Sequence, residues 1–216
     1  MPENLIEKIG QIRSELFDRG PDFERERGDF HRVSLPLRDC EVLRDFVQQS
    51  DSTRAVEIGL AYGASALAIA EGLVSTSPEH EHVILDPFQN IFNDVGWRLI
   101  TSAGLVRHTK LIRQKSQFAL PELIAAGQTA DIAFVDGSHF FHNVFLDLTY
   151  LEELVKFGGL IILDDVQHRS VAKAVAYFVA NRGWAEVGLR ASDTRLTAFR
   201  LPDEPVKSSF EDFVDF

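Results

Sequence analysis

Acidic residues stand at the carboxyl ends of four of the five apolar segments that read as buried strands in this 216-residue chain. They are Glu57, Asp86, Asp136, Asp164 and Asp165. Open α/β sheets bind their ligands beyond the carboxyl ends of the strands, so acids at these positions are candidates for binding and catalysis. Aspartate also caps helices, and one or two such acids would carry little information. Acids after four strands predict a polar binding site at one edge of a sheet.

The last three of these acids predict a metal site. If the fourth and fifth strands are neighbours about 4.8 Å apart, their ends bring the carboxylates of Asp136, Asp164 and Asp165 close together. A cation or a shared proton relieves the repulsion between like charges at that distance. Oxygen ligands alone suit a hard ion, Mg²⁺ first and Ca²⁺ or Mn²⁺ next. In the alternative interpretation Asp136 and Asp165 cap helices and Asp164 points to solvent.

The segment Arg54–Ser65, RAVEIGLAYGAS, predicts a strand, a glycine turn and the start of a helix. Gly59 and Gly63 permit a sharp turn and the close approach of a ligand. The N–H groups of the helix start are free to face that ligand, and Glu57 can accept hydrogen bonds from a positively charged group. The spacing excludes the dinucleotide fingerprint G-x-G-x-x-G and the P-loop. Glycines that serve packing alone are the alternative.

Two further strand ends carry groups that suit a nucleoside. Asp86 ends the second predicted strand, where an acid can accept hydrogen bonds from both hydroxyls of a ribose. Ser116 and Gln117 follow the third predicted strand, where a polar pair can reach the edge of an adenine.

Apolar strand patterns alternate with helical ones from residue 54 onward. Strands are predicted at 54–58, 82–86, 109–113, 131–136 and 159–164, and helices at 64–74, 93–102, 118–126, 143–156 and 169–182. Such alternation predicts parallel strands joined by crossover helices. The segments 184–188 and 195–201, on either side of the polar stretch 190–194, predict a final antiparallel pair. The fold class is therefore α/β.

The flanking segments complete one predicted domain, whose α/β core spans 54–201. Residues 1–53 hold an amphipathic helix at 3–18, which packs on its own domain or forms a lid or dimer contact. A charged segment at 20–31 is predicted to be a mobile loop that closes over a site, and 34–49 to be helical. The acidic tail 202–216 is predicted to be loose or docked on a neighbour.

Composition narrows the classes of partner. A net charge of −11 argues against a nucleic-acid backbone or an anionic membrane as the main partner. The single cysteine, Cys40, excludes a disulfide framework. We read no signal peptide and no membrane span, so we expect a cytoplasmic enzyme. A homodimer is one expectation for its oligomeric state.

The motif E-x-G-x-x-x-G-x-S at 57–65 resembles the first motif of class I S-adenosylmethionine (SAM) methyltransferases. Residues 134–166, FVDGSHFFHNVFLDLTYLEELVKFGGLIILDDV, resemble the metal-dependent small-molecule O-methyltransferases. That group includes catechol O-methyltransferase and the sugar O-methyltransferases of antibiotic pathways. The resemblance implies that 54–201 is a SAM-dependent methyltransferase domain. Its sheet would be Rossmann-like and seven-stranded, mostly parallel, with helices on both faces.

The resemblance also implies roles for particular residues. Asp136, Asp164 and Asp165 match the metal ligands, and Asp165 departs from the asparagine that is usual in catechol enzymes, which argues against a catechol substrate. His139 stands where catechol enzymes carry a lysine proton acceptor, with a solvated surface histidine as the alternative. The residues predicted to bind SAM are Glu57, Gly59, Ala61, Gly63, Ser65, Asp86, Phe88, Ser116, Gln117 and Asp136.

These observations predict a SAM-dependent O-methyltransferase that acts on a small vicinal diol or catechol-like hydroxyl. A divalent ion would lower the pKa of the hydroxyl, and His139, with Asp136 beside the ion, would take the proton. Candidates for the walls of the adenine and acceptor sites are Phe88, Phe92, Trp97, Phe140 and Phe141. Two alternatives stay open: a metal-free methyltransferase of the same fold, and a non-catalytic SAM-binding or interaction module.

Overall fold

The computed structural model of the chain describes residues 2–189, 193–206 and 210–216. The contacts divide the chain into two compact units, Met1–Lys115 and Ser116–Phe216, which we call unit 1 and unit 2. The predicted single domain with boundaries at 53 and 201 stays a prediction. Among the described residues, no helix is both long enough and apolar enough to cross a membrane.

Unit 1 contains three parallel strands in the order β3-β2-β1 among its described residues. They are β1 (Arg54–Ile58), β2 (Glu81–Leu85) and β3 (Thr109–Ile112). Each lies within one residue of its predicted position, because its apolar residues are bounded by polar ones. Parallel neighbours need crossovers, and α4 (Ala64–Thr76) and α5 (Val95–Ala103) supply them, with a short 3₁₀ helix, η1 (Gln89–Phe92), before α5.

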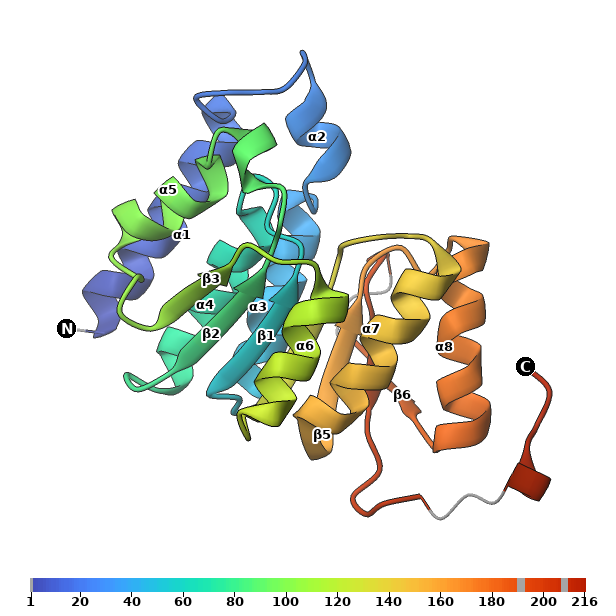
Figure 1. Cartoon of the computed structure of the whole chain (residues 1–216). Helices are drawn as coiled ribbons and strands as arrows, with labels where there is room; N and C mark the ends of the chain where they lie inside the picture. Colours follow the sequence, from blue (N-terminus) through green and yellow to red (C-terminus); the bar gives the residue numbers. More distant parts are fainter. Residues whose placement is uncertain (1, 190–192, 207–209) are drawn as a thin grey trace. The chain divides into compact units, whose positions relative to one another are not determined.

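α4 lies along the strands of unit 1, and neighbouring helices pack on it (Figure 1). α4 is buried on nearly all sides because α1 (Pro2–Arg19) and α3 (Leu37–Gln49) both pack against it. Gly72 makes the α3 contact possible, since a Cβ there would lie 2.8 Å from the Arg44 carbonyl oxygen. Arg13 of α1 donates a 2.8 Å hydrogen bond to buried Glu71 of α4. The amphipathic first helix therefore packs on its own unit.

The charged segment at 20–31 is anchored, which the prediction of a mobile loop did not anticipate. Its end forms α2 (Asp29–Val33), in which Asp29 and Phe30 are each 1% exposed. Arg25 donates two hydrogen bonds to the Asp29 carboxylate, at 2.6 and 2.9 Å. Phe30 packs its ring against Phe17 and Tyr62. Buried charge pairing and aromatic packing hold this segment to unit 1.

Unit 2 contains four strands in the order β4-β5-β7-β6 among its described residues. They are β4 (Ala130–Val135), β5 (Val155–Leu163), β6 (Ala185–Val187) and β7 (Thr197–Arg200). β4 and β5 are parallel, while β7 is antiparallel to both β5 and β6, which confirms the predicted final pair. β5 begins at Val155, four residues earlier than predicted. The polar and glycine residues before 159 break the apolar pattern, but the strand continues through them, including Gly158 with its φ of 69°.

Three helices of unit 2 lie side by side along its strands (Figure 1). They are α6 (Ser116–Ala125), α7 (Phe141–Leu154) and α8 (Arg169–Arg182). All three start within two residues of their predicted positions. α7 and α8 each begin a few residues after a strand-end acid, so the loops β4–α7 and β5–α8 carry the chemically interesting side chains.

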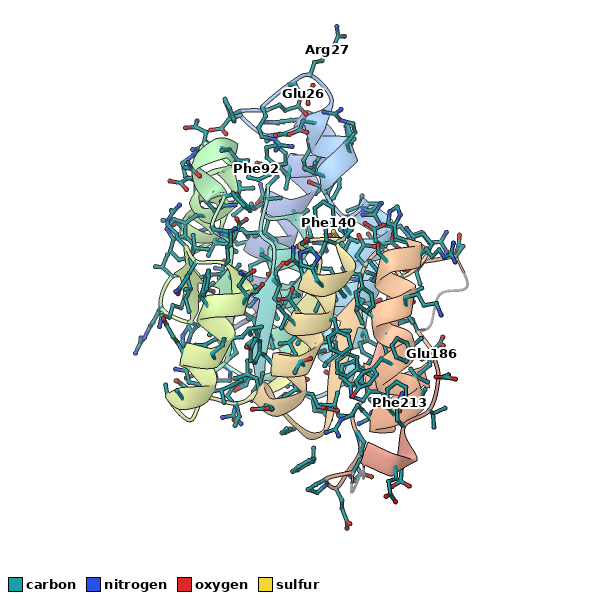
Figure 2. All side chains as sticks on the ribbon, turned by 45° about the vertical axis from the view of Figure 1, so that its right-hand side comes forward. Glu26, Arg27, Phe92, Phe140, Glu186 and Phe213 are labelled. Atoms are coloured by element: carbon teal, nitrogen blue, oxygen red, sulfur yellow. The ribbon has the colours of Figure 1, made fainter. Side chains whose placement is uncertain are left out.

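The described part of the acidic tail docks on α8 of its own unit. Asn181 exchanges two hydrogen bonds with the backbone of Val214, and Lys173 donates one of 2.7 Å to the Phe216 carbonyl oxygen. The rings of Phe213 and Phe216 lie 6.4 and 5.3 Å from that of Tyr177. Figure 2 shows Phe213 beside α8. Residues 190–192 of the predicted hairpin turn and 207–209 of the tail lie outside the described residues.

Candidate active site

The glycine turn between β1 and α4 contains three positive φ angles within five residues. Gly59, Ala61 and Gly63 have φ of 99°, 43° and 87°. Glycine adopts these angles freely, whereas the left-handed conformation at Ala61 costs roughly 1 kcal/mol. α4 begins after Gly63 with no capping side chain among the described residues, so its first N–H groups are available to an anionic ligand. The predicted turn is confirmed, including its sharpness.

Two glycines bring the start of α5 against this turn. A Cβ on Gly63 would lie 2.9 Å from the Gly96 Cα, and one on Gly96 would lie 2.8 Å from the Ala61 carbonyl oxygen. Both distances are shorter than real Cβ contacts. Gly63 therefore serves packing as well as the turn, and Gly96 is a residue that the sequence motif did not single out.

Asp86, at the end of β2, organises the glycine turn. Its Oδ2 accepts hydrogen bonds from the N–H groups of Leu60 and Ala61, both 3.0 Å, and from Nε2 of Gln89 at 2.9 Å. Its Oδ1 accepts the N–H of Phe88 at 2.7 Å. The residue is 4% exposed. The predicted contact with a ribose stays a prediction, and the structure shows a second role that needs no ligand.

Glu57, at the end of β1, is completely buried and engaged by the protein itself. Ser65 of α4 donates a 2.6 Å hydrogen bond to its Oε1. Nε2 of His82 lies 2.9 Å from its Oε2, close enough for an ion pair although the two groups are not aligned for a hydrogen bond. Glu57 and Ser65 thus fasten β1 to α4. Sequence reasoning missed His82. Ile84 of β2 is the register partner of Glu57, and His82, two residues before Ile84, projects from the same face of the sheet as Glu57.

Aromatic residues near the turn divide into exposed and packed ones. Phe88 is 53% exposed, and its predicted contact with SAM stays a prediction. Phe92 is buried between the ring of Tyr62, 5.0 Å away, and the guanidinium of Arg25, 4.6 Å above its ring. The Tyr62 hydroxyl donates to Asp29, whose pKa is lowered to about 2 chiefly by its hydrogen bonds from Arg25. Phe92 therefore belongs to the core of unit 1.

In unit 2, the ends of β4 and β5 bring two acids and a histidine together. Val135 and Leu163 are register partners, so Asp136 and Asp165 follow neighbouring strand ends. Nε2 of His139 lies 3.1 Å from Oδ2 of Asp165 and 4.0 Å from Oδ1 of Asp136. Ligand atoms from these three residues all lie within 4.8 Å of one another. The sequence predicted that Asp136, Asp164 and Asp165 converge, and the structure brings Asp136 and Asp165 together with His139; that these residues hold an ion stays a prediction.

Asp164 occupies a different environment from Asp165. It is 2% exposed, its Oδ2 accepts a 2.6 Å hydrogen bond from Arg195, and its Oδ1 accepts the N–H of Asp165 at 2.8 Å. Burial raises the pKa of Asp164 above its ordinary value, and the charge of Arg195 opposes part of that rise. Sequence reasoning missed Arg195, which lies just before β7. Whether Asp164 also reaches an ion stays a prediction.

The loop after Asp165 surrounds the cluster with polar groups. The ring of His168 stacks on that of His139 at 5.5 Å, and its Nε2 lies 3.7 Å from Oδ1 of Asp165. Gln167 donates a 2.6 Å hydrogen bond to the same oxygen. Phe140, 70% exposed, follows at the start of α7 (Figure 2) and remains a candidate wall for an acceptor.

Ser116 and Gln117 begin α6, where both are half-buried. Ser116 interacts with Asp147 of α7, an acid that is 1% exposed and that sequence reasoning missed. Burial raises the pKa of Asp147 to about 6, and Ser116 opposes part of that rise. The interaction is not a well-aligned hydrogen bond, since neither carboxylate oxygen has such a partner among the described residues. Adenine binding by the Ser116–Gln117 pair stays a prediction.

Comparison with solved structures supports the fold. Cofactor-bound Rv0187 from MTB matches with a TM-score of 0.69 and 17% identity, covering 91% of this chain and 90% of that one. The O-methyltransferase from Bacillus cereus in complex with SAH matches with a TM-score of 0.65 and 16% identity, covering 91% of this chain and 90% of that one. TomG from Streptomyces achromogenes, an O-methyltransferase of tomaymycin synthesis in complex with SAM, matches with a TM-score of 0.65 and 17% identity, covering 92% of this chain and 89% of that one. These likenesses confirm the predicted Rossmann-like methyltransferase fold.

Sequence comparison assigns the family. The search of curated proteins found no match. The model of a methyltransferase-domain family matches residues 56–166, which run from β1 past the end of β5. That range contains the glycine turn, Asp86 and the Asp136–His139–Asp165 cluster, and it is more than half of the chain. The chain therefore belongs to this methyltransferase-domain family.

Proposed function

We propose that this methyltransferase uses SAM to methylate a hydroxyl oxygen of a small molecule, a vicinal diol or a catechol-like compound, with the help of a divalent ion. The observation that carries the proposal is the cluster of Asp136, His139 and Asp165 at two neighbouring strand ends of a methyltransferase-family chain. The relatives from Bacillus cereus and Streptomyces achromogenes are described as O-methyltransferases with SAH or SAM bound.

Most of the residues proposed to bind SAM lie in unit 1, and Ser116, Gln117 and Asp136 of unit 2 remain proposed contacts. The turn at 59–63 keeps its shape through Asp86, so it is organised before a ligand arrives. The uncapped first turn of α4 offers N–H donors and the positive end of the helix dipole, which suit the carboxylate of the methionine part. Phe88 is exposed and can lie against the nucleoside. Asp86 has a further lone pair on Oδ1 for a ribose hydroxyl.

Acceptor binding and proton removal are assigned to unit 2. The donor set of two carboxylates and an imidazole, all within 4.8 Å, fits a divalent ion held by Asp136 and Asp165, with Asp164 adjacent. When bound, such an ion would lower the pKa of the acceptor hydroxyl and orient it. The half-exposed imidazole of His139 is placed to take a proton from the acceptor. Phe140 would cover an apolar face of the acceptor.

A metal-free reaction is the second candidate, and one observation favours it. The acids already have partners within the protein. Arg195 donates a hydrogen bond to Asp164, Gln167 donates one to Asp165, and the imidazole of His139 lies beside Asp165. In that case Asp165 orients the imidazole, and His139 alone deprotonates the acceptor while positioning supplies the rest of the acceleration.

The test is transfer of a labelled methyl group from SAM to a panel of catechols, vicinal diols and sugars. The assay is run in purified buffer, with EDTA, and with EDTA followed by excess Mg²⁺ or Mn²⁺. Transfer that EDTA abolishes and an ion restores supports the proposal. Transfer that EDTA leaves unchanged supports the metal-free candidate. SAM binding by calorimetry without transfer to any acceptor contradicts both and supports a SAM-binding module.

A further inference from the structure

We infer that His139 is a ligand of the proposed ion, in the place that the family resemblance gives to Asp164. The site would then prefer a borderline divalent ion, such as Mn²⁺, Co²⁺, Ni²⁺ or Zn²⁺, over Mg²⁺. This inference rests on the metal-assisted form of the proposed function, specifies its ion, and replaces the proton-accepting role that the proposal gives to His139.

The distances within the cluster match a shared ion. Two ligand atoms that lie about 2.1 Å from one ion are ~3.0 Å apart at right angles and ~4.2 Å apart on opposite sides. Nε2 of His139 is 3.1 Å from Oδ2 of Asp165 and 4.0 Å from Oδ1 of Asp136. The two separations from His139 therefore match those between ligands of one ion, and the ligand atoms of all three residues lie within 4.8 Å of one another.

Asp164 is less suited to the same ion in this structure. Both of its oxygens accept hydrogen bonds, one from Arg195 at 2.6 Å and one from the Asp165 N–H at 2.8 Å. Its side chain is fully buried, while those of Asp136 and Asp165 are 18% and 13% exposed. Turning Asp164 toward an ion would leave Arg195 half-buried without its partner, which is costly.

The fold holds His139 and Asp165 toward each other. Ser170 of α8 donates a 2.6 Å hydrogen bond to the His139 carbonyl oxygen, and the imidazole stacks on His168. Asp165 has φ of 60°, a left-handed conformation that aspartate tolerates better than most non-glycine residues. Gln167 occupies Oδ1 of Asp165, so Oδ2 is the oxygen that faces His139.

An imidazole ligand changes the choice of ion. Mg²⁺ favours oxygen ligands and keeps much of its water, whereas imidazole nitrogen suits later divalent ions. The Nε2 lone pair cannot bind an ion and accept a proton at the same time. If His139 is a ligand through Nε2, its role is to hold the ion, and the proton acceptor predicted from the sequence is another group.

The test measures binding of Mn²⁺, Co²⁺ and Mg²⁺ to the full-length protein by calorimetry, with the Co²⁺ absorption spectrum as a second readout. The variants are His139→Asn and the matched control His142→Asn, which changes an exposed histidine one turn further along. We expect Co²⁺ to bind at least about 100-fold tighter than Mg²⁺ to the wild type. Losing one ligand should weaken Co²⁺ binding by at least about 10- to 100-fold in His139→Asn and shift its spectrum. His142→Asn should match the wild type.

Other outcomes overturn the inference in distinguishable ways. If His139→Asn binds Co²⁺ as the wild type does, or weakens Mg²⁺ and Co²⁺ equally, His139 is not the selecting ligand, while the metal-assisted methyltransferase stands. If Asp164→Asn loses the ion and His139→Asn keeps it, the resemblance was right about the third ligand. If the wild type binds none of the ions, with or without SAM, both the inference and the metal-assisted function are wrong.

Discussion

Glu57 and Asp86 of unit 1 and Asp136 and Asp165 of unit 2 hold similar positions in the sequence pattern, at strand ends, but differ in environment, while Asp164 of unit 2 is buried like the acids of unit 1. Glu57 and Asp86 are buried and bound by donors of their own unit: a serine hydroxyl, three backbone N–H groups and an amide. Asp136 and Asp165 are partly exposed and lie beside a half-exposed imidazole. The first pair builds a turn, and the second pair remains accessible to a ligand.

The difference originates in the loop after each strand. A glycine turn after β1 directs backbone N–H groups at the neighbouring strand end, and Asp86 accepts them. The loops after β4 and β5 instead bring histidines, which offer a lone pair as well as a proton. The donors that its own and neighbouring loops present thus decide how far an acid at a strand end is enclosed by the protein.

The largest effect is expected for Asp136→Ala. Turnover should fall by roughly 10²–10³-fold, the scale of losing one preorganised electrostatic group, while the melting temperature stays within a few degrees because the side chain lies at a partly exposed strand end. Initial rates with labelled SAM and thermal unfolding check this. If activity falls only in proportion to the folded fraction, Asp136 is structural and the contrast between the units fails.

Asp86→Ala should act mainly on stability, unlike Asp136→Ala. It removes the acceptor of four hydrogen bonds from a buried site, so the free energy of unfolding should fall by about 4 kcal/mol and SAM should bind more weakly. Urea unfolding and calorimetry with SAM measure the two effects. Asp86→Asn keeps part of the acceptor capacity and should lose less. An unchanged stability with abolished SAM binding would make Asp86 a ligand-binding acid like those of unit 2.

Gly63→Ala tests whether the close approach of the Gly96 backbone to the turn of unit 1 matters for stability. The new Cβ would meet the Gly96 backbone at 2.9 Å, at a φ of 87°. Clash and left-handed backbone together should cost about 3 kcal/mol of unfolding free energy. Gly104→Ala is a matched control, since its φ is 88° but nothing lies within 4 Å of the added Cβ. Equal losses in the two variants would show that backbone strain alone matters.

Asp147 shows what burial does to an acid without the donors that Asp86 has. Its pKa is raised from the ordinary 3.8 to about 6, so between these values the folded state keeps a proton that the unfolded state releases. Stability therefore falls as pH rises through this window, by about 2–3 kcal/mol in total. Asp147→Asn should remove this loss. The unfolding free energy of the variant, compared with that of the wild type at the same pH, should therefore be higher at pH 8 than at pH 4. Identical pH profiles of unfolding free energy would contradict the assignment.

Local patterns predicted the elements well. Strand positions follow from apolar runs such as 54–58, and helix starts follow from the polar residues after each strand. The convergence of Asp136 with Asp165 also follows, because parallel neighbours place their carboxyl ends at one edge. The family resemblance then supplied the candidate chemistry, which the family match supports at the level of methyltransferase.

The partners of the acids could not be predicted, because they come from distant segments. Arg195 reaches Asp164 from the loop before β7, and the N–H groups of Leu60 and Ala61 reach Asp86 from the turn after β1. Charge alone does not say which acid finds a partner and which stays accessible. Asp29 is a further example: Arg25 donates to it from the same segment, but its other donor, the Tyr62 hydroxyl, comes from 33 residues further along the chain.

The acids of unit 1 are proposed to build the SAM turn, and those of unit 2 to bind the ion. The direct test of this division is a pair of calorimetric titrations, with SAM and with Mn²⁺, on Asp86→Asn and Asp165→Gly. Glycine at 165 keeps the positive φ without strain. We expect Asp86→Asn to weaken SAM binding and leave Mn²⁺ binding unchanged, and Asp165→Gly to do the reverse. If both variants weaken both ligands equally, or if Asp165→Gly binds Mn²⁺ as the wild type does, the division of roles is contradicted.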